Sequence, residues 1–73
     1  MMDGDPIWDF LRKHVADEFR RYDNADEYTS VGRLDGQIAR ARLEAFRVTA
    51  QAAGFDVQAL WEIAKGDARK VSE

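Results

Sequence analysis

The segment NADEYTSVGRLDGQIARARLEAFRVTAQAA, residues 24–53, decides the fold of this chain. Its apolar residues recur at alternating spacings of three and four, a pattern that predicts an amphipathic helix. Projected at 100° per residue, they occupy an arc of roughly 220°, whereas a helix packed on one side needs only about 100°. Two surfaces of this helix must therefore be covered. The residues with these spacings are Val31, Leu34, Ile38, Ala41, Ala45, Val48 and Ala52. The arc is completed by flanking residues, which are Tyr28, Ala39, Leu43, Phe46, Ala50 and Ala53.

The size of the chain makes additional burial valuable. The chain has 73 residues and no cysteine. A lone hydrophobic core in a domain of this size leaves only about 3–5 kcal/mol of net stability. Disulfides and thiolate metal sites are excluded, and no cofactor signature is visible. We therefore expect the protein to gain further burial by self-association as a homodimer.

The charge of the chain disfavours two classes of partner. The formal net charge is −3, so a general attraction to nucleic acid or to anionic lipid is not expected. The middle of the chain is nevertheless locally basic, because residues 29–54 hold four arginines against two acids. No basic leader precedes an apolar run, and no run approaches the roughly 18–20 apolar residues that a bilayer requires. We expect a cytoplasmic protein that does not bind membranes.

Capping residues divide the chain into helices. Asp5, which is followed by proline, predicts a first helix over about 6–22. Asn24 opens an N-x-x-E capping box, so we expect the second helix over about 25–53. The hydroxyl residues at positions 29 and 30 are alternative caps for a later start.

Glycine and aspartate mark the last joint. Gly54 is the expected end of the second helix, since glycine enters the left-handed conformation without a steric penalty. Asp56 caps a third helix that we predict over about 57–65, with Gly66 fraying or stopping it. The residues 67–73 are mostly polar and are predicted to form a loosely attached tail.

These lengths predict an all-α, three-helix domain in residues 1–73. Short joints make sequential helices antiparallel neighbours. We expect the long second helix to lie at the centre, flanked by the first helix on its first half and by the third on its second half. The flanking helices would cover one side only. The other side would remain for a second copy, giving a homodimeric helical bundle.

Two charged residues lie inside the apolar arc of the second helix. Asp35 and Arg42 are seven residues apart, so an antiparallel pairing of two copies would bring each beside the other, twice. Such pairs fix the register of an interface. The alternative is that both side chains reach solvent at the edge of the arc. The predicted protein interface comprises Val31, Leu34, Asp35, Ile38, Ala41, Arg42, Ala45 and Val48.

Gly32 and Gly36 form a G-x-x-x-G pair in the same segment. Each glycine inside a helix costs about 1 kcal/mol relative to alanine, so something should offset that cost. Close approach of a neighbouring helix, with Trp8 or Phe10 in the groove, is one explanation. The other is that the glycines mark a late start of the helix.

Residues that could carry chemistry are few. His14, Asp17 and Glu18 have the spacing of metal ligands on one helix face, but one imidazole and two carboxylates are an incomplete set. The ordinary interpretation is a solvated face with a contact between His14 and Glu18. The chain has no phosphate-binding loop and no nucleophile motif. We expect no catalytic, cofactor or metal site.

The function that these features favour is protein binding without catalysis, by an adaptor, inhibitor or regulator. The Gly32–Gly36 stretch, GRLDG in an alanine-rich helix, resembles small accessory proteins of bacteriophages from high-GC hosts, which adds a phage or mobile-element origin as one version of this hypothesis. Five common residues carry over no function. The alternative is a helix-turn-helix DNA-binding regulator that uses residues 46–64 around Gly54. Two carboxylates near the start of its recognition helix oppose that alternative.

Overall fold

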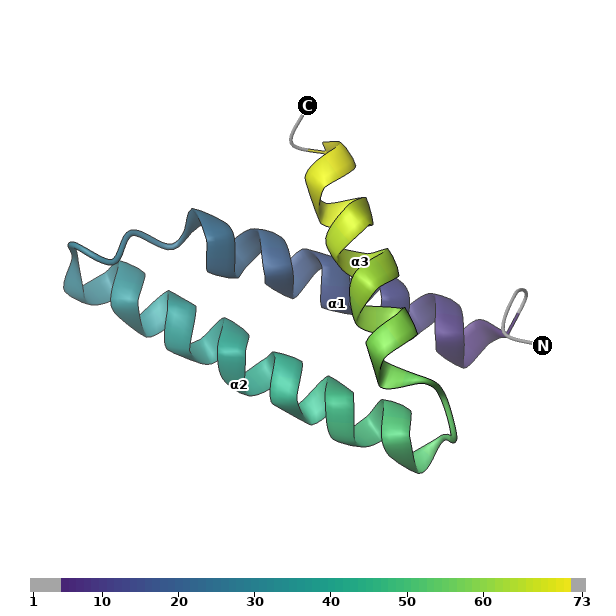
Figure 1. The fold of residues 1–73 in the computed structure, drawn as a ribbon. Coiled ribbons are helices and arrows are strands. Elements are labelled where there is room, and N and C mark those ends of the chain that lie inside the picture. The colour runs from purple at the N-terminus through teal and green to yellow at the C-terminus, as the bar shows by residue number, and fades with distance from the viewer. Residues whose placement is uncertain (1–4, 72–73) are drawn as a thin grey trace.

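The computed structural model describes residues 5–71, which form three helices. These are α1 (Pro6–Asn24), α2 (Ser30–Ala52) and α3 (Val57–Val71). The predicted all-α, three-helix architecture is confirmed. In Figure 1, α1 and α2 run side by side, while α3 leaves the end of α2 and crosses α1.

The start of α1 is the predicted one. Asp5 is the N-cap, and its carboxylate accepts hydrogen bonds from the backbone amides of Ile7, at 2.8 Å, and Trp8, at 3.5 Å. Pro6 occupies the first helical turn, where its missing amide hydrogen leaves no bond unmade. A cap of this kind stabilises a helix by about 1 kcal/mol.

The start of α2 lies later than the capping box predicted. The helix begins at Ser30, and Thr29 is its N-cap, with its hydroxyl accepting from the amide of Gly32 at 2.9 Å. Asn24 cannot cap α2, because it belongs to the last turn of α1 and an N-cap needs extended backbone. The predicted helix over 25–53 was therefore wrong at its first five residues, which form the linker between the helices.

The two glycines near the start of α2 face this linker. A Cβ placed on Gly32 would lie 1.8 Å from the carbonyl oxygen of Asp26, so only glycine fits. A Cβ on Gly36 would lie 3.6 Å from the Cβ of Ala25. The close approach predicted for these glycines is present, but the linker makes it. Of the two residues expected in that groove, Trp8 packs near the other end of α2 in one cluster with Ala50, and Phe10 is 55% exposed.

The joint between α2 and α3 follows the prediction. Gly54 has φ of 83°, and its amide donates to the carbonyl of Gln51, while the amide of Phe55 donates to the carbonyl of Ala50, each at 3.0 Å. These two bonds satisfy carbonyls at the end of α2 in the Schellman manner. Asp56 then accepts from the amide of Ala59 at 3.2 Å and caps α3.

Helix α3 continues beyond the predicted end at residue 65. It passes through Gly66 to Val71, so the expected polar tail is helical over most of its length, and residues 72–73 lie outside the described part of the chain. Contacts with α1 explain this. Ala68 is buried, and the carboxylate of Asp67 accepts two hydrogen bonds from the guanidinium of Arg12, at 2.6 and 3.0 Å. Packing against α1 offsets the low helix propensity of Gly66.

The ion pair between Arg12 of α1 and Asp67 of α3 makes the contact between these helices depend on pH. The hydrogen bond from Arg12 holds the pKa of the Asp67 carboxyl below its usual range. A carboxyl whose pKa is lowered by folding stabilises the protein above its unfolded pKa of about 4, and that stabilisation is lost as the pH falls through the folded pKa.

Replacement of Asp67 by asparagine should therefore lower stability at pH 7 and not at pH 2. The expected loss at pH 7 is about 0.5–1 kcal/mol, because the pair is partly exposed. Thermal unfolding followed by circular dichroism at both pH values measures the effect. An equal loss at the two pH values would assign it to the altered side chain and not to the ion pair.

The helix at the centre is α1, contrary to the prediction for α2. One core cluster joins Trp8 and Leu11 of α1 to Ala50 and Leu60, and a second joins Val15 and Ala16 of α1 to Ala64 and Ala68. Helices α2 and α3 make few contacts with one another. Helix α1 carries apolar residues both on the side that faces α2 and on the side that faces α3. The alanines of α3 also allow that helix to approach α1 closely.

Helix α1 also covers more of α2 than predicted. Trp8, in its first turn, meets Ala50 near the end of α2, and Glu18 lies near Arg42. The following linker reaches Gly36. The expected division of α2 between α1 and α3 was wrong, because the antiparallel α1 and the linker that follows it together cover that side.

Candidate interaction surface

All eight residues of the predicted interface are exposed on α2. The apolar ones include large side chains, with Val31 71%, Leu34 55% and Val48 54% exposed. Their spacings of three and four give a continuous stripe along one side of the helix. We call this set the α2 stripe: Val31, Leu34, Asp35, Ile38, Ala41, Arg42, Ala45 and Val48.

The other side of α2 carries the contacts with α1. Ala39 and Ala50 are buried there, Leu43 and Phe46 are half-buried, and Gly32 is buried against the linker on the same side. These residues fall between the members of the α2 stripe in sequence, so the stripe faces away from α1. The wide apolar arc predicted from the sequence thus consists of two faces, of which the single chain covers one.

Arg42 lies at the edge of the α2 stripe and contacts α1. Its guanidinium is 3.7 Å from the Glu18 carboxylate, and Arg21 donates to the same carboxylate oxygen at 3.2 Å. Asp35 is exposed at the same edge. Together with Ile38, these residues line a groove between the end of α1 and the middle of α2.

The environment of Glu18 differs from the solvated helix face that the sequence predicted. The side chain of Glu18 is only 5% exposed, so the predicted solvated face is wrong at this position. The expected contact between His14 and Glu18 is not seen among residues 5–71, where the imidazole packs against the ring of Phe10, with 4.2 Å between centroids and 42° between the ring planes. The Oε1 atom of Glu18 is buried without a hydrogen-bond partner among the described residues. Two arginines, Arg21 and Arg42, instead lie beside the other oxygen, Oε2.

Sequence reasoning missed the burial of Glu18 because only one of its two arginine partners, Arg21, is local. Arg42 lies 24 positions away, on another helix. The local signal, an acid at three residues from Arg21, indicates a surface pair on one helix. Only the antiparallel packing of α1 on α2 brings the two arginines to one carboxylate.

Residues 5–71 contain no group of three His, Cys, Asp or Glu side chains placed to hold a metal ion. None of their helices combines the length and the apolar character needed to cross a bilayer. Comparison with protein-family models, with curated proteins and with solved structures found no match.

Proposed function

We propose that this chain is a small, non-catalytic protein–protein interaction module, an adaptor, inhibitor or regulator, that forms a homodimer through α2. The exposed α2 stripe carries the proposal. Apolar area in water costs free energy, roughly 25 cal/mol for each Å² that burial would remove. A small domain that presents a continuous apolar stripe is expected to cover it with another protein surface.

The sizes of the stripe residues fit a second copy in antiparallel orientation. Residues at spacings of three and four form the seam of two packed helices. If the helices run in opposite directions, large side chains of one copy meet small side chains of the other at the centre of the seam. This complementarity allows close packing of the backbones. The pairs, one residue from each copy, are Ile38 with Ala41, Leu34 with Ala45, and Val31 with Val48.

The charges at the edge of the seam also favour the antiparallel orientation. In that orientation, Asp35 of each copy lies opposite Arg42 of the other, so two ion pairs form. A parallel pair would instead place Arg42 beside Gln37 and Asp35 beside Ser30, with no opposite charges facing one another. Edge charges of this kind set the orientation and register of a helical pair more than they add affinity.

Glu18 supports the same arrangement. Its contact with Arg42 restrains the guanidinium at the edge of the α2 stripe before a second copy binds. Restraint in the free protein lowers the entropy lost on association. Arg42 would then lie between Glu18 of its own chain and Asp35 of the second copy.

The direct test is the mass in solution. The chain has a mass of 8.3 kDa, and light scattering at micromolar concentrations should give twice that value. A constant mass of one chain across the micromolar range would contradict the proposal.

A matched pair of variants assigns the interface. Ile38→Glu places a charge in the α2 stripe and should shift the protein to monomer. Arg33→Glu introduces the same residue at another exposed position of α2, outside the stripe, and should leave the dimer unchanged. Both positions are exposed in the single chain, so circular dichroism should show full helix content for each variant. Equal effects of the two would place the interface elsewhere.

DNA binding through residues 46–64 is the alternative function. The Schellman turn at Gly54, with Ala50 and Leu60 buried on its two sides, is the observation that favours it. Exposed Asp56 and Glu62 at the beginning of α3 would face phosphates and oppose binding. A gel mobility shift with duplex DNA at low salt distinguishes the functions. A shift that is lost in α3 variants would favour the alternative over the interaction module.

A further inference from the structure

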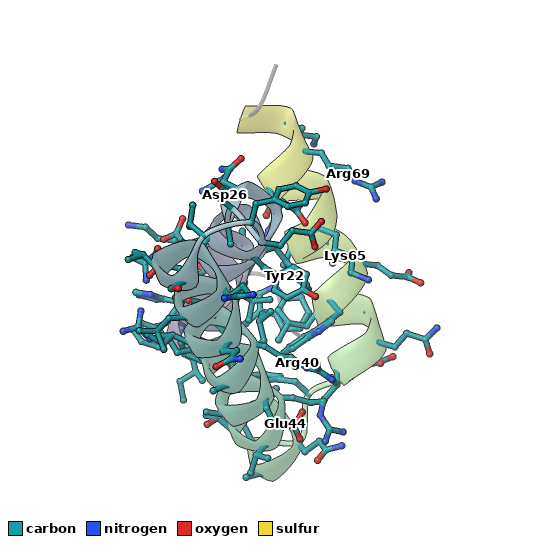
Figure 2. All side chains as sticks on the ribbon, turned by 90° about the vertical axis from the view of Figure 1, so that its left-hand side faces the viewer. Tyr22, Asp26, Arg40, Glu44, Lys65 and Arg69 are labelled. Atoms are coloured by element: carbon teal, nitrogen blue, oxygen red, sulfur yellow. The ribbon has the colours of Figure 1, made fainter. Side chains whose placement is uncertain are left out.

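A second surface lies on the side of the molecule where α2 and α3 diverge. The two helices diverge on either side of the Gly54 turn, and α1 packs against both of them. Tyr22, near the end of α1, is 49% exposed there. Figure 2 shows its ring between α2 and α3, with Arg40 on the α2 side and Lys65 and Arg69 on the α3 side.

Two hollows meet at Tyr22. The first lies between the 25–29 linker and the start of α2, and its lining includes Tyr28, Arg33 and Arg40. The second lies toward α3 and is lined by Phe19, Lys65 and Arg69 among others. We call the combined surface the Tyr22 groove, defined by Tyr22, Tyr28, Arg33, Arg40, Lys65 and Arg69.

The four cations of the Tyr22 groove form no ion pair within residues 5–71. Lys65 instead lies over the ring of Phe19, 5.5 Å from its centroid. Elsewhere the arginines are matched with carboxylates, as Arg20 is with Asp17 and Arg47 with Glu44. A protein of net charge −3 thus places four cations without ion pairs around exposed tyrosines, in hollows whose lining also includes Asp23 and Glu27. This combination is typical of a surface that binds an anionic group with an apolar anchor.

We infer that the Tyr22 groove binds an acidic segment of a partner protein, with carboxylates on the four cations and one aromatic or aliphatic side chain against Tyr22. Arginine binds carboxylates through paired hydrogen bonds, and tyrosine supplies a rigid apolar contact. The inference deepens the proposed function, because it names the chemistry of the partner. The groove shares no residue with the α2 stripe, so an experiment can contradict the proposal for one surface without contradicting the proposal for the other.

The acids around the groove favour a peptide over nucleic acid. Asp23 and Glu27 line the two hollows, and Asp26 lies at the rim in Figure 2. A nucleic-acid backbone carries a charge at every phosphate and would meet these carboxylates. A peptide can place uncharged residues opposite them. The mixed charges therefore match a sequence of spaced acids.

The test is selection from a random 12-residue peptide display library, followed by fluorescence anisotropy with the selected peptides. Peptides rich in Asp and Glu around one aromatic residue or leucine are the expected result. Arg40→Glu and Lys65→Glu should each weaken their binding about tenfold, and Tyr22→Ala should weaken it more than Tyr22→Phe. Lys13→Glu is the matched control, since Lys13 is exposed on α1 away from the groove, and it should have little effect.

Two outcomes would overturn the inference. One is selected peptides without acidic enrichment, or acidic peptides whose affinity is the same for Lys65→Glu and Lys13→Glu. The other is tighter binding of a single-stranded oligothymidylate of equal length than of the best peptide, which would make the groove a nucleic-acid surface. The Ile38→Glu variant should bind the peptides as the wild type does. Loss of dimerisation without loss of peptide binding would then separate the two surfaces.

Discussion

Leu60→Ala is expected to lower the free energy of unfolding by about 2–5 kcal/mol, a large part of what a domain of this size possesses. Leu60 is 0% exposed and packs in one cluster with Trp8, Leu11 and Ala50, where all three helices meet. Truncation would remove apolar contacts and leave a cavity between the three helices. Urea denaturation, followed by the negative circular-dichroism band that helices give near 222 nm, measures the loss.

Ile63→Ala is the control for that prediction. Ile63 is on the same helix but 38% exposed, so its truncation leaves an open surface depression and should cost clearly less than the loss at Leu60. Equal losses at both positions would mean that α3 is held by helix propensity and not by docking on α1. The comparison is best made with dilute protein, so that dimer formation does not contribute to the measured stability.

Asp35→Arg is expected to weaken the proposed homodimer by about 2–4 kcal/mol, or roughly 30- to 1,000-fold in Kd. In the antiparallel pair, the new arginine of each copy would face Arg42 of the other, and the repulsion would occur twice. Asp35 is exposed, and no ion pair within residues 5–71 involves it, so the fold of the single chain should not change. Sedimentation equilibrium or light scattering over a dilution series gives the Kd.

Mixing two variants makes the test of orientation decisive. A chain with Arg42→Asp should also dimerise poorly, but equal amounts of it and Asp35→Arg should form a heterodimer, because opposite charges then face each other at both contacts. Glu18 lies beside position 42, so Glu18→Gln is included in both chains to avoid a new repulsion within one of them. A mixture that stays monomeric, or single variants with unchanged Kd, would exclude the antiparallel pairing.

The sequence predicted those helix ends that depend on a few adjacent residues. The Asp5 cap and the left-handed Gly54 are local features, and both were predicted. The start of α2 was missed because two caps competed, and the longer α1 settled the competition in favour of Thr29. The end of α3 was missed because Asp67 is stabilised by Arg12, which lies 55 positions earlier in the chain.

The exposed stripe could be predicted because it depends only on the spacing of apolar residues within one helix. The position of α1 at the centre could not be predicted in this way. It depends on whether the small residues of α3 pack against α1 or against α2. Both helices carry large apolar residues, Trp8 and Val15 on α1 and Leu34 and Ile38 on α2, and periodicity does not rank the two helices. The Tyr22 groove was also missed. The groove depends on the angle between α2 and α3, and the spacing of residues in the sequence does not predict that angle.

Gly32 restricts how this sequence can drift during evolution. Any other side chain there would displace the backbone carbonyl of Asp26, so a change at position 32 requires a compensating rearrangement of the linker. Gly54 is restricted for a different reason, its positive φ, although the space around it is open. Gly66 is under neither restriction and can accept alanine with a gain in helix propensity. Divergent relatives should therefore keep the first two glycines and exchange the third freely.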